Sequence, residues 1–224
     1  MPISRLKRRI VWELVCLIIA TFLYFILIDR SFVINVSAAL FGLLMLALNV
    51  RFTHNVVWAQ YPLDMSKSER LHGCVMSLLP VVLIALGLCL VVGMILGYAD
   101  NGWPTVWARL GNWHIFVAVG IYLPWALVQQ TLCQFYLHGR LRLLLPPVVA
   151  VTCTGIAFGL VHVPDIFVML ITTGLGIFWT VLYARFRLLI PLAVSHAMLG
   201  AAFFYWVYGR DLALKWGKQV LGLL

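Results

Sequence analysis

Long apolar stretches, separated by short polar segments, run along almost the whole chain. Each has about the 20 residues that a helix needs to cross the hydrocarbon core of a bilayer. The pattern predicts about seven spans, at Ile10–Ile28, Phe32–Val50, Cys74–Gly97, His114–Leu137, Leu145–His162, Ile166–Ala184 and Leu188–Tyr208. Because these stretches are continuous and rich in leucine, they favour helices over the short alternating strands of a β-barrel. The predicted fold is therefore an all-α, polytopic membrane protein.

The composition excludes a soluble fold. Of 224 residues, 64% are hydrophobic and only 10% are charged, and the mean hydropathy is +1.03. A soluble domain keeps roughly a quarter of its residues charged to cover its surface. The five cysteines all lie inside apolar stretches, which is typical of small core residues and not of a disulfide framework or a zinc site. They are Cys16, Cys74, Cys89, Cys133 and Cys153.

The net charge of +9 is explained by a membrane location without a nucleic-acid partner, and the positions of the basic residues predict an orientation in the membrane. Cytoplasmic segments of membrane proteins hold the excess of Lys and Arg. With the N-terminus inside, the inner segments hold Arg5, Lys7, Arg8, Arg9, Arg51, Lys67, Arg70, Arg140, Arg142, Arg185 and Arg187. We therefore expect a cytoplasmic N-terminus, as in a protein of the bacterial inner membrane. Glu13 follows several of these cations and is expected to pair with one of them.

One integrated membrane domain is expected, with three parts. Residues 1–113 form supporting spans, residues 114–210 form a core that carries the polar residues, and residues 211–224 form a short tail that can rest on the membrane interface. Two loops are longer than a turn. Residues 51–73 are polar and expected to be cytoplasmic, and residues 99–113 carry tryptophans that suit an outer aromatic belt.

The candidate site comes from polar side chains inside the last four spans. Such groups are costly in lipid and are functional candidates by default. Gln130, Gln134 and His138 are spaced at i, i+4 and i+8, so they form one stripe on a helix. Together with His162 and His196 on later spans, they predict a buried polar pocket. The alternative is that these side chains only form hydrogen bonds between helices.

Simple hairpins would place Gln130 and His162 at different depths in the membrane, because a helix rises about 1.5 Å per residue. Pro124 and the Pro146–Pro147 pair can kink or shorten helices and so bring them level.

Three ordered motifs resemble those of the CPBP family of intramembrane proteases, which includes CaaX prenyl proteases and bacteriocin-processing and self-immunity proteins. The family motifs are Glu-Glu-x-x-x-Arg, Phe-x-x-x-His and His-x-x-x-Asn. The corresponding positions here are Gln129-Gln130 with Gln134, then Phe158 with His162, then His196 with Gly200. The second motif matches in full and the third at its histidine, within a resemblance that covers about residues 123–202.

The departures fall on the residues that the resemblance makes catalytic. The family's glutamate activates a water molecule, and its histidines and asparagine support the attack on a carbonyl. A glutamine amide cannot accept the proton as a carboxylate does, and Gly200 lacks an amide that could stabilise an oxyanion. By resemblance, His162, His196, Gln129 and Gln130 take the catalytic positions, and Gln134 and Phe158 take substrate-binding positions.

Three interpretations stay open. The chain is an atypical intramembrane peptidase in which a histidine is the base. Alternatively, it is a catalytically silent relative that binds a peptide or lipidated tail as a chaperone, immunity factor or scaffold. A small transporter ranks below both, because the chain lacks the paired repeats of many transporters. The expected partners are membrane lipid and a membrane-associated peptide or protein. No cofactor and no metal are expected, because catalytic zinc usually has three protein ligands.

Overall fold

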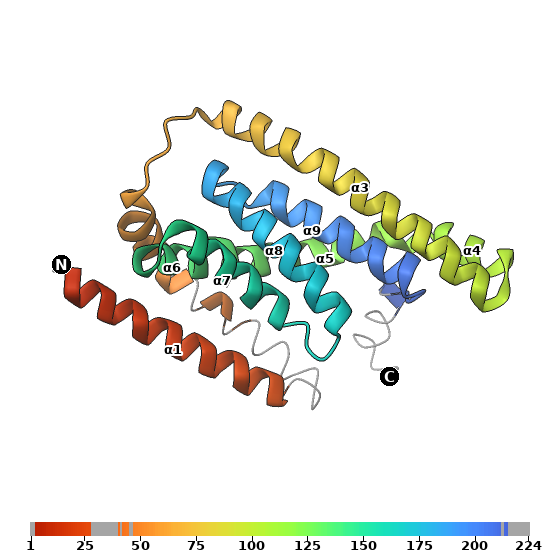
Figure 1. The fold of residues 1–224 in the computed structure, drawn as a ribbon, viewed down its shortest axis with the longest axis horizontal. Helices are drawn as coiled ribbons and strands as arrows, with labels where there is room; N and C mark the ends of the chain where they lie inside the picture. Colours follow the sequence, from red (N-terminus) through yellow and green to blue (C-terminus); the bar gives the residue numbers. More distant parts are fainter. Residues whose placement is uncertain (1–2, 28–39, 41, 45–46, 212, 215–224) are drawn as a thin grey trace. The chain divides into compact units, whose positions relative to one another are not determined.

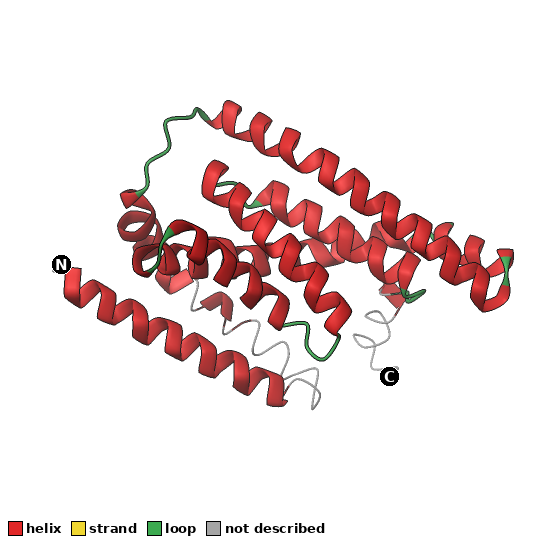
Figure 2. Ribbon diagram, viewed as in Figure 1, coloured by secondary structure: helices red, strands yellow, loops and turns green. Residues whose placement is uncertain are grey.

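The computed structural model describes residues 3–27, 40, 42–44, 47–211 and 213–214, and these contain helices and no strand (Figures 1 and 2). The α-helices are α1 (Ile3–Leu27), α3 (Lys67–Asn101), α4 (Trp103–Leu110), α5 (His114–Gln130), α6 (His138–Leu144), α7 (Pro147–Leu160), α8 (Ile166–Phe186) and α9 (Ile190–Ala202). Shorter turns are the π-helical segments Thr53–Val57, Thr131–Leu137 and Phe203–Val207, and the 3₁₀ segment Trp58–Gln60.

The all-α membrane fold predicted from the sequence is confirmed. Within the described residues, 4 helices are long and apolar enough to cross a membrane: Lys67–Asn101, His114–Leu144, Ile166–Phe186 and Ile190–Val207. The first predicted span overlaps α1, which has 25 residues and ends at Leu27. Most of the second predicted span and most of the predicted tail lie outside the described residues, so the expected number of spans stays a prediction.

The predicted fifth span, Leu145–His162, is too long. The helix there, α7, has 14 residues, which at 1.5 Å per residue is about 21 Å. Pro147 occupies the first turn of α7, where its missing N–H costs nothing, and a turn follows Leu160. His162 therefore lies in the turn beyond the end of α7.

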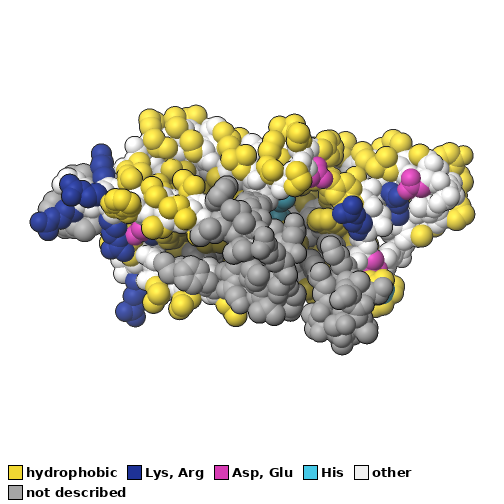
Figure 3. Space-filling model, turned by 90° about the horizontal axis from the view of Figure 1, so that it is seen from below, with side chains coloured by type: hydrophobic (Ala, Val, Ile, Leu, Met, Phe, Trp, Pro, Cys, Tyr) yellow, Lys and Arg dark blue, Asp and Glu magenta, His cyan; other side chains and the backbone are white. Residues whose placement is uncertain are grey.

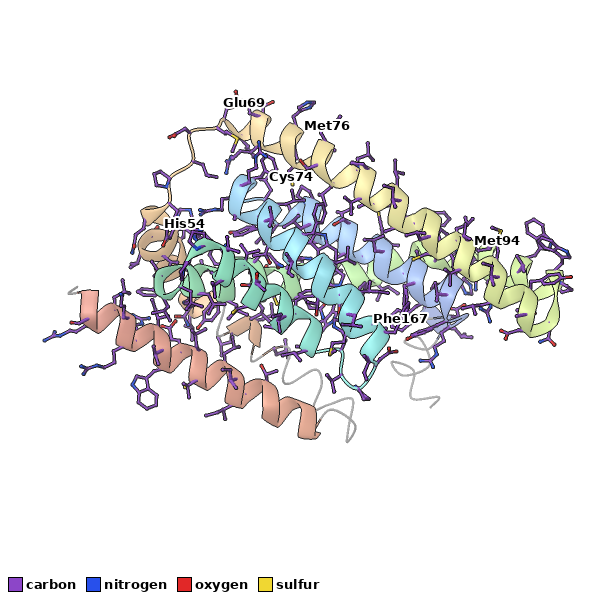
Figure 4. The ribbon with its side chains drawn as sticks, in the orientation of Figure 1. His54, Glu69, Cys74, Met76, Met94 and Phe167 are labelled. Atoms are coloured by element: carbon purple, nitrogen blue, oxygen red, sulfur yellow. The ribbon has the colours of Figure 1, made fainter. Side chains whose placement is uncertain are left out.

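The two predicted loops are also more structured than expected. In residues 99–113 the chain turns at Gly102, whose φ of +73° favours glycine, and then forms α4. In residues 51–73 the chain is helical to Gln60, and Trp58 is buried. A capping box between Ser66 and Glu69 then starts α3 (Figure 4).

The chain divides into two compact units, the first made of residues 1–64 and 131–185 and the second of residues 65–130 and 186–224. The three-part division expected from the sequence stays a prediction. In the first unit, α6 packs against α1 and α7. The buried Trp58 indole donates a hydrogen bond to the Phe135 carbonyl at 3.0 Å and packs on the rings of His138 and Tyr183.

In the second unit, α9 packs closely against α5, and α3 packs against α4 and α9. Small side chains allow the α5–α9 approach, because Ala126, Ala193 and Ala197 form a buried cluster between the two helices. On α3, Cys74 is fully buried while Met76 is 55% exposed (Figure 4). Groups of apolar side chains are exposed on the face in Figure 3, and many large apolar residues are exposed along α3.

Asp211 forms several hydrogen bonds with residues of the second unit. Its carboxylate accepts hydrogen bonds from Tyr205 at 2.5 Å, Asn112 at 3.1 Å and the Leu214 N–H at 2.9 Å, and contacts the His114 Nδ1 at 2.7 Å. Burial acts to raise the pKa of Asp211, but these donors outweigh it and hold the pKa well below its usual range.

Candidate functional site

A chain of neutral hydrogen-bonding groups joins α5 and α9 in the second unit. The Tyr122 hydroxyl donates to Gln129 Oε1 at 3.3 Å and lies 3.3 Å from His196 Nε2. Gln130 Nε2 lies 3.5 Å from His196 Nδ1. The structure thus brings together three of the predicted site residues, Gln129, Gln130 and His196, around a tyrosine that the sequence motifs did not indicate.

The directions of these hydrogen bonds assign the protonation of His196. The Gln130 amide nitrogen can only donate, so His196 Nδ1 accepts. His196 then carries its proton on Nε2 and donates to the Tyr122 oxygen, whose own proton goes to Gln129 Oε1. Both ring nitrogens are therefore engaged by neutral partners.

Tyr122 depends on the glycine that replaces the asparagine of the third motif. A Cβ atom added at Gly200 would lie 2.8 Å from Tyr122 Cε1, closer than carbon atoms pack. The tyrosine ring therefore occupies space that any larger residue at position 200 needs, and it stands edge-on to the His196 ring at 5.5 Å. The sequence signal for this contact was Gly200 itself, because a glycine at the motif position leaves space for a side chain from a neighbouring helix.

His162 lies at the end of α7 in the first unit. Its Nδ1 is 3.1 Å from the Phe158 carbonyl and 3.2 Å from Thr172 Oγ1 on α8. A carbonyl only accepts, so Nδ1 carries the proton, and the lone pair of the neutral ring is on Nε2. Phe158 is buried, 5.9 Å from the His162 ring and edge-on to Trp179 at 5.5 Å. Phe158 thus supports His162 from the preceding helical turn.

Gln134 lies in the π-helical turn Thr131–Leu137 of the first unit, a kind of turn that is frequent at functional sites. It is fully buried, and its amide nitrogen donates to Thr180 Oγ1 at 3.4 Å. Among the described residues, its carbonyl oxygen has no hydrogen-bond partner, and the same is true of Gln130 Oε1. These two oxygens are acceptors that a donor group could use.

The predicted stripe of Gln130, Gln134 and His138 is buried along its whole length. The three side chains have different surroundings, however. His138 packs on the Trp58 ring at 5.8 Å, while Gln130 contacts His196. Gln129, Gln130 and His196 belong to the second unit, and Gln134, Phe158 and His162 belong to the first. Their roles as catalytic or substrate-binding residues stay predictions.

Carboxylates are scarce around these motifs. Between Asp100 and Asp211 the sequence contains one acidic residue, Asp165. Its Oδ1 accepts the Val168 N–H at 3.0 Å in the first turn of α8, which is the hydrogen bond of a helix N-cap. Within the described residues, no group of three or more His, Cys, Asp or Glu side chains could hold a metal ion.

We expect the change Gly200→Ala to destabilise the protein by about 1–2 kcal/mol, because the added methyl group collides with the Tyr122 ring. The same change in a Tyr122→Ala background should be nearly neutral. Gly120→Ala on α5 is the matched control, since a Cβ there meets no atom within 4 Å. Unfolding in mixed detergent micelles measures the wild type, the two single variants, the double variant and the control, and equal costs of Gly200→Ala in both backgrounds would contradict the proposed packing.

Comparison with known proteins gives one match. Residues 110–202 match the model of the family described as type II CAAX prenyl endopeptidase Rce1-like. Comparisons with curated proteins and with solved structures found no significant match. The matched region contains all three motif positions and the helices that carry them. The resemblance to the CPBP family is therefore confirmed for residues 110–202, which are similar to Rce1-like, type II CAAX prenyl endopeptidases.

Proposed function

We propose that this protein binds a membrane-associated peptide or protein, such as a lipidated tail, without cleaving it. The observation that carries the proposal is the state of His196. Both of its ring nitrogens are engaged by neutral groups, the Gln130 amide and the Tyr122 hydroxyl. A ring whose two nitrogens already have hydrogen-bond partners is better suited to positioning a ligand than to activating water.

The acidic residues of the matched region support the same conclusion. Hydrolysis of an amide by an activated water needs a group that accepts a proton near neutral pH. Glutamines occupy both positions where the resemblance expects the glutamates, and an amide does not accept that proton. Asp165, the one carboxylate between residues 110 and 202, caps α8. The protein therefore retains the histidine positions of a peptidase without its usual base.

The remaining hydrogen-bonding capacity suits a peptide. The buried carbonyl oxygen of Gln130, without a partner among the described residues, can accept a hydrogen bond from a backbone N–H. Burying such an acceptor without a partner costs roughly 1–3 kcal/mol. A bound peptide that donates to it would recover that free energy.

A second function, an atypical peptidase, is favoured by His162. Its Nδ1–H is held by Phe158 and Thr172, which leaves the Nε2 lone pair as a proton acceptor. In this mechanism water transfers a proton to Nε2 while its oxygen bonds to the scissile carbonyl carbon. The C–N bond then breaks, and the imidazolium returns the proton to the leaving amine.

The two functions are separated by mass spectrometry of the C-termini of membrane proteins in cells. The comparison uses the wild type, a deletion, His162→Ala and the double variant Gln129→Glu/Gln130→Glu. We expect no difference in processing between the wild type and the deletion, and capture of a membrane-associated peptide by photocrosslinkers near Gln130. Substrates cut in the wild type and spared in both the deletion and His162→Ala would establish the peptidase instead.

The double variant tests whether only the base is missing. Cleavage that appears with the two glutamates alone would show that the rest of the site is competent and that glutamine silences it. If Tyr122→Ala or Gln130→Ala left peptide crosslinking unchanged, the binding proposal for this site would be wrong. Gln60→Ala, at an exposed glutamine of the first unit, is the matched control for the glutamine variant.

A further inference from the structure

A groove on the first unit lies apart from the motif residues. It has a volume of about 580 Å³, within the range of sites for small molecules. Its wall is largely apolar and aromatic, with Gln60 as a polar member beside Leu6 of α1, Phe52, Val56, Tyr61 and Leu143 of α6. The Tyr61 hydroxyl donates to the Arg142 carbonyl at 2.9 Å, so the tyrosine is fixed and offers its ring to the groove.

Cations surround this apolar wall. Lys7 lines the groove itself. The Arg9 guanidinium lies 3.9 Å from the centre of the Phe52 ring, and the Arg142 guanidinium lies 4.8 Å from the centre of the Tyr61 ring. The two aromatic walls thus each carry an arginine, in the cation–π arrangement that holds a guanidinium in place.

The charge around the start of α1 is mainly positive. The first turns of α1 contain Arg5, Lys7, Arg8 and Arg9, and the first acidic residue after them, Glu13, is engaged by Arg9 and Arg140. One exposed carboxylate of this unit, Asp64, follows Tyr61 by three positions. Figure 3 shows Lys and Arg side chains gathered at the end of the molecule where α1 begins. An occupant that places a negative group here gains electrostatic free energy, whereas a cationic one does not.

We propose that the groove binds one anionic phospholipid, with its phosphate beside Lys7 and Arg142 and the start of an acyl chain along the Val56 wall. A ligand for this groove must be negative at one end and apolar at the other. An anionic phospholipid of the bilayer has a negative headgroup and apolar acyl chains. The orientation expected from the sequence places these cations at the cytoplasmic surface, where each attracts anionic lipid by an amount that corresponds to about a fivefold change in binding.

Lipid retention measured by native mass spectrometry tests this site. The full-length protein is extracted in detergent with equal amounts of phosphatidylglycerol, phosphatidylethanolamine and phosphatidylcholine. We expect one retained phosphatidylglycerol, with its binding reduced about fivefold by Lys7→Gln and abolished by Val56→Trp, which fills the groove. Lys67→Gln, at an exposed lysine in the first turn of α3, is the matched control and should bind as the wild type does.

Other outcomes would overturn the proposal. Equal retention of the three lipids, or an equal loss with Lys67→Gln, would show that no specific site exists. Inorganic phosphate that displaces the lipid at millimolar concentration would show that the apolar wall contributes nothing. Displacement by a soluble acidic peptide would assign the groove to a protein partner. Lys7 is exposed, so its variant should fold, and the peptide-crosslinking yield checks that the motif residues are unaffected.

Discussion

Glu13→Gln should destabilise the protein by about 3–5 kcal/mol, the cost of leaving a buried charge without its partner. Arg140 is fully buried, and its Nε donates to Glu13 Oε2 at 2.8 Å. Tyr136 donates to the same carboxylate oxygen at 3.2 Å, and its ring lies 3.5 Å from the Arg140 guanidinium. Arg140 Nη1 also donates a hydrogen bond to the Thr53 hydroxyl at 2.8 Å.

Unfolding in mixed micelles with increasing dodecyl sulfate measures this loss. The double variant Glu13→Gln/Arg140→Met should be more stable than Glu13→Gln alone, because it removes the unpaired charge as well. Glu69→Gln is the matched control: Glu69 is exposed, and glutamine also serves in a capping box. If Glu13→Gln unfolds at the same dodecyl sulfate content as the wild type, the ion pair does not stabilise the packing of α1 on α6.

The second large effect is expected for Gly159→Ala, which should cost about 2–3 kcal/mol through overpacking. A Cβ atom at Gly159 would lie 2.7 Å from the Met169 carbonyl oxygen on α8 and closer still to the Thr173 hydroxyl. A carbonyl of the backbone cannot turn away as a side chain can, so α7 and α8 must separate. Gly155, one turn earlier, faces the Ile177 backbone in the same way.

The consequence for the site follows from Thr172. It contacts His162 Nδ1 at 3.2 Å, so separation of the helices should also free the His162 ring. We expect a lower unfolding midpoint together with a shifted ¹⁵N resonance of the His162 imidazole. Gly174→Ala on α8, where a Cβ meets no atom within 4 Å, is the matched control. A neutral Gly159→Ala would contradict the close packing of α7 and α8.

The sequence indicates the contacts of Glu13 and of Gly159 to different extents. Glu13 among several cations already indicated an ion pair, and the structure confirms one with Arg9 at 2.8 Å. The sequence did not indicate Arg140 as the second partner, because that residue is more than a hundred positions away. Gly155 and Gly159 have the spacing at which small residues let membrane helices approach closely, but the spacing does not name the partner helix.

For the site, the motif positions could be found from the sequence because they are defined by residue type and order. Tyr122 could not, because its role comes from the space above Gly200 on a different helix. Nor could the protonation of the histidines, which depends on whether a neighbour donates or accepts. His162 faces a carbonyl and His196 faces an amide N–H, so the two rings carry their protons on opposite nitrogens.

The sequence by itself determined that this protein lies in a lipid bilayer, and it determined the family resemblance. A chain with 64% hydrophobic residues in continuous stretches must form helices in lipid, because the backbone has no other partner there. The tertiary structure decided where α7 ends, which groups hold His162 and His196, and how Arg140 is neutralised. These depend on contacts between segments far apart in the chain, and local patterns of hydrophobicity do not encode them.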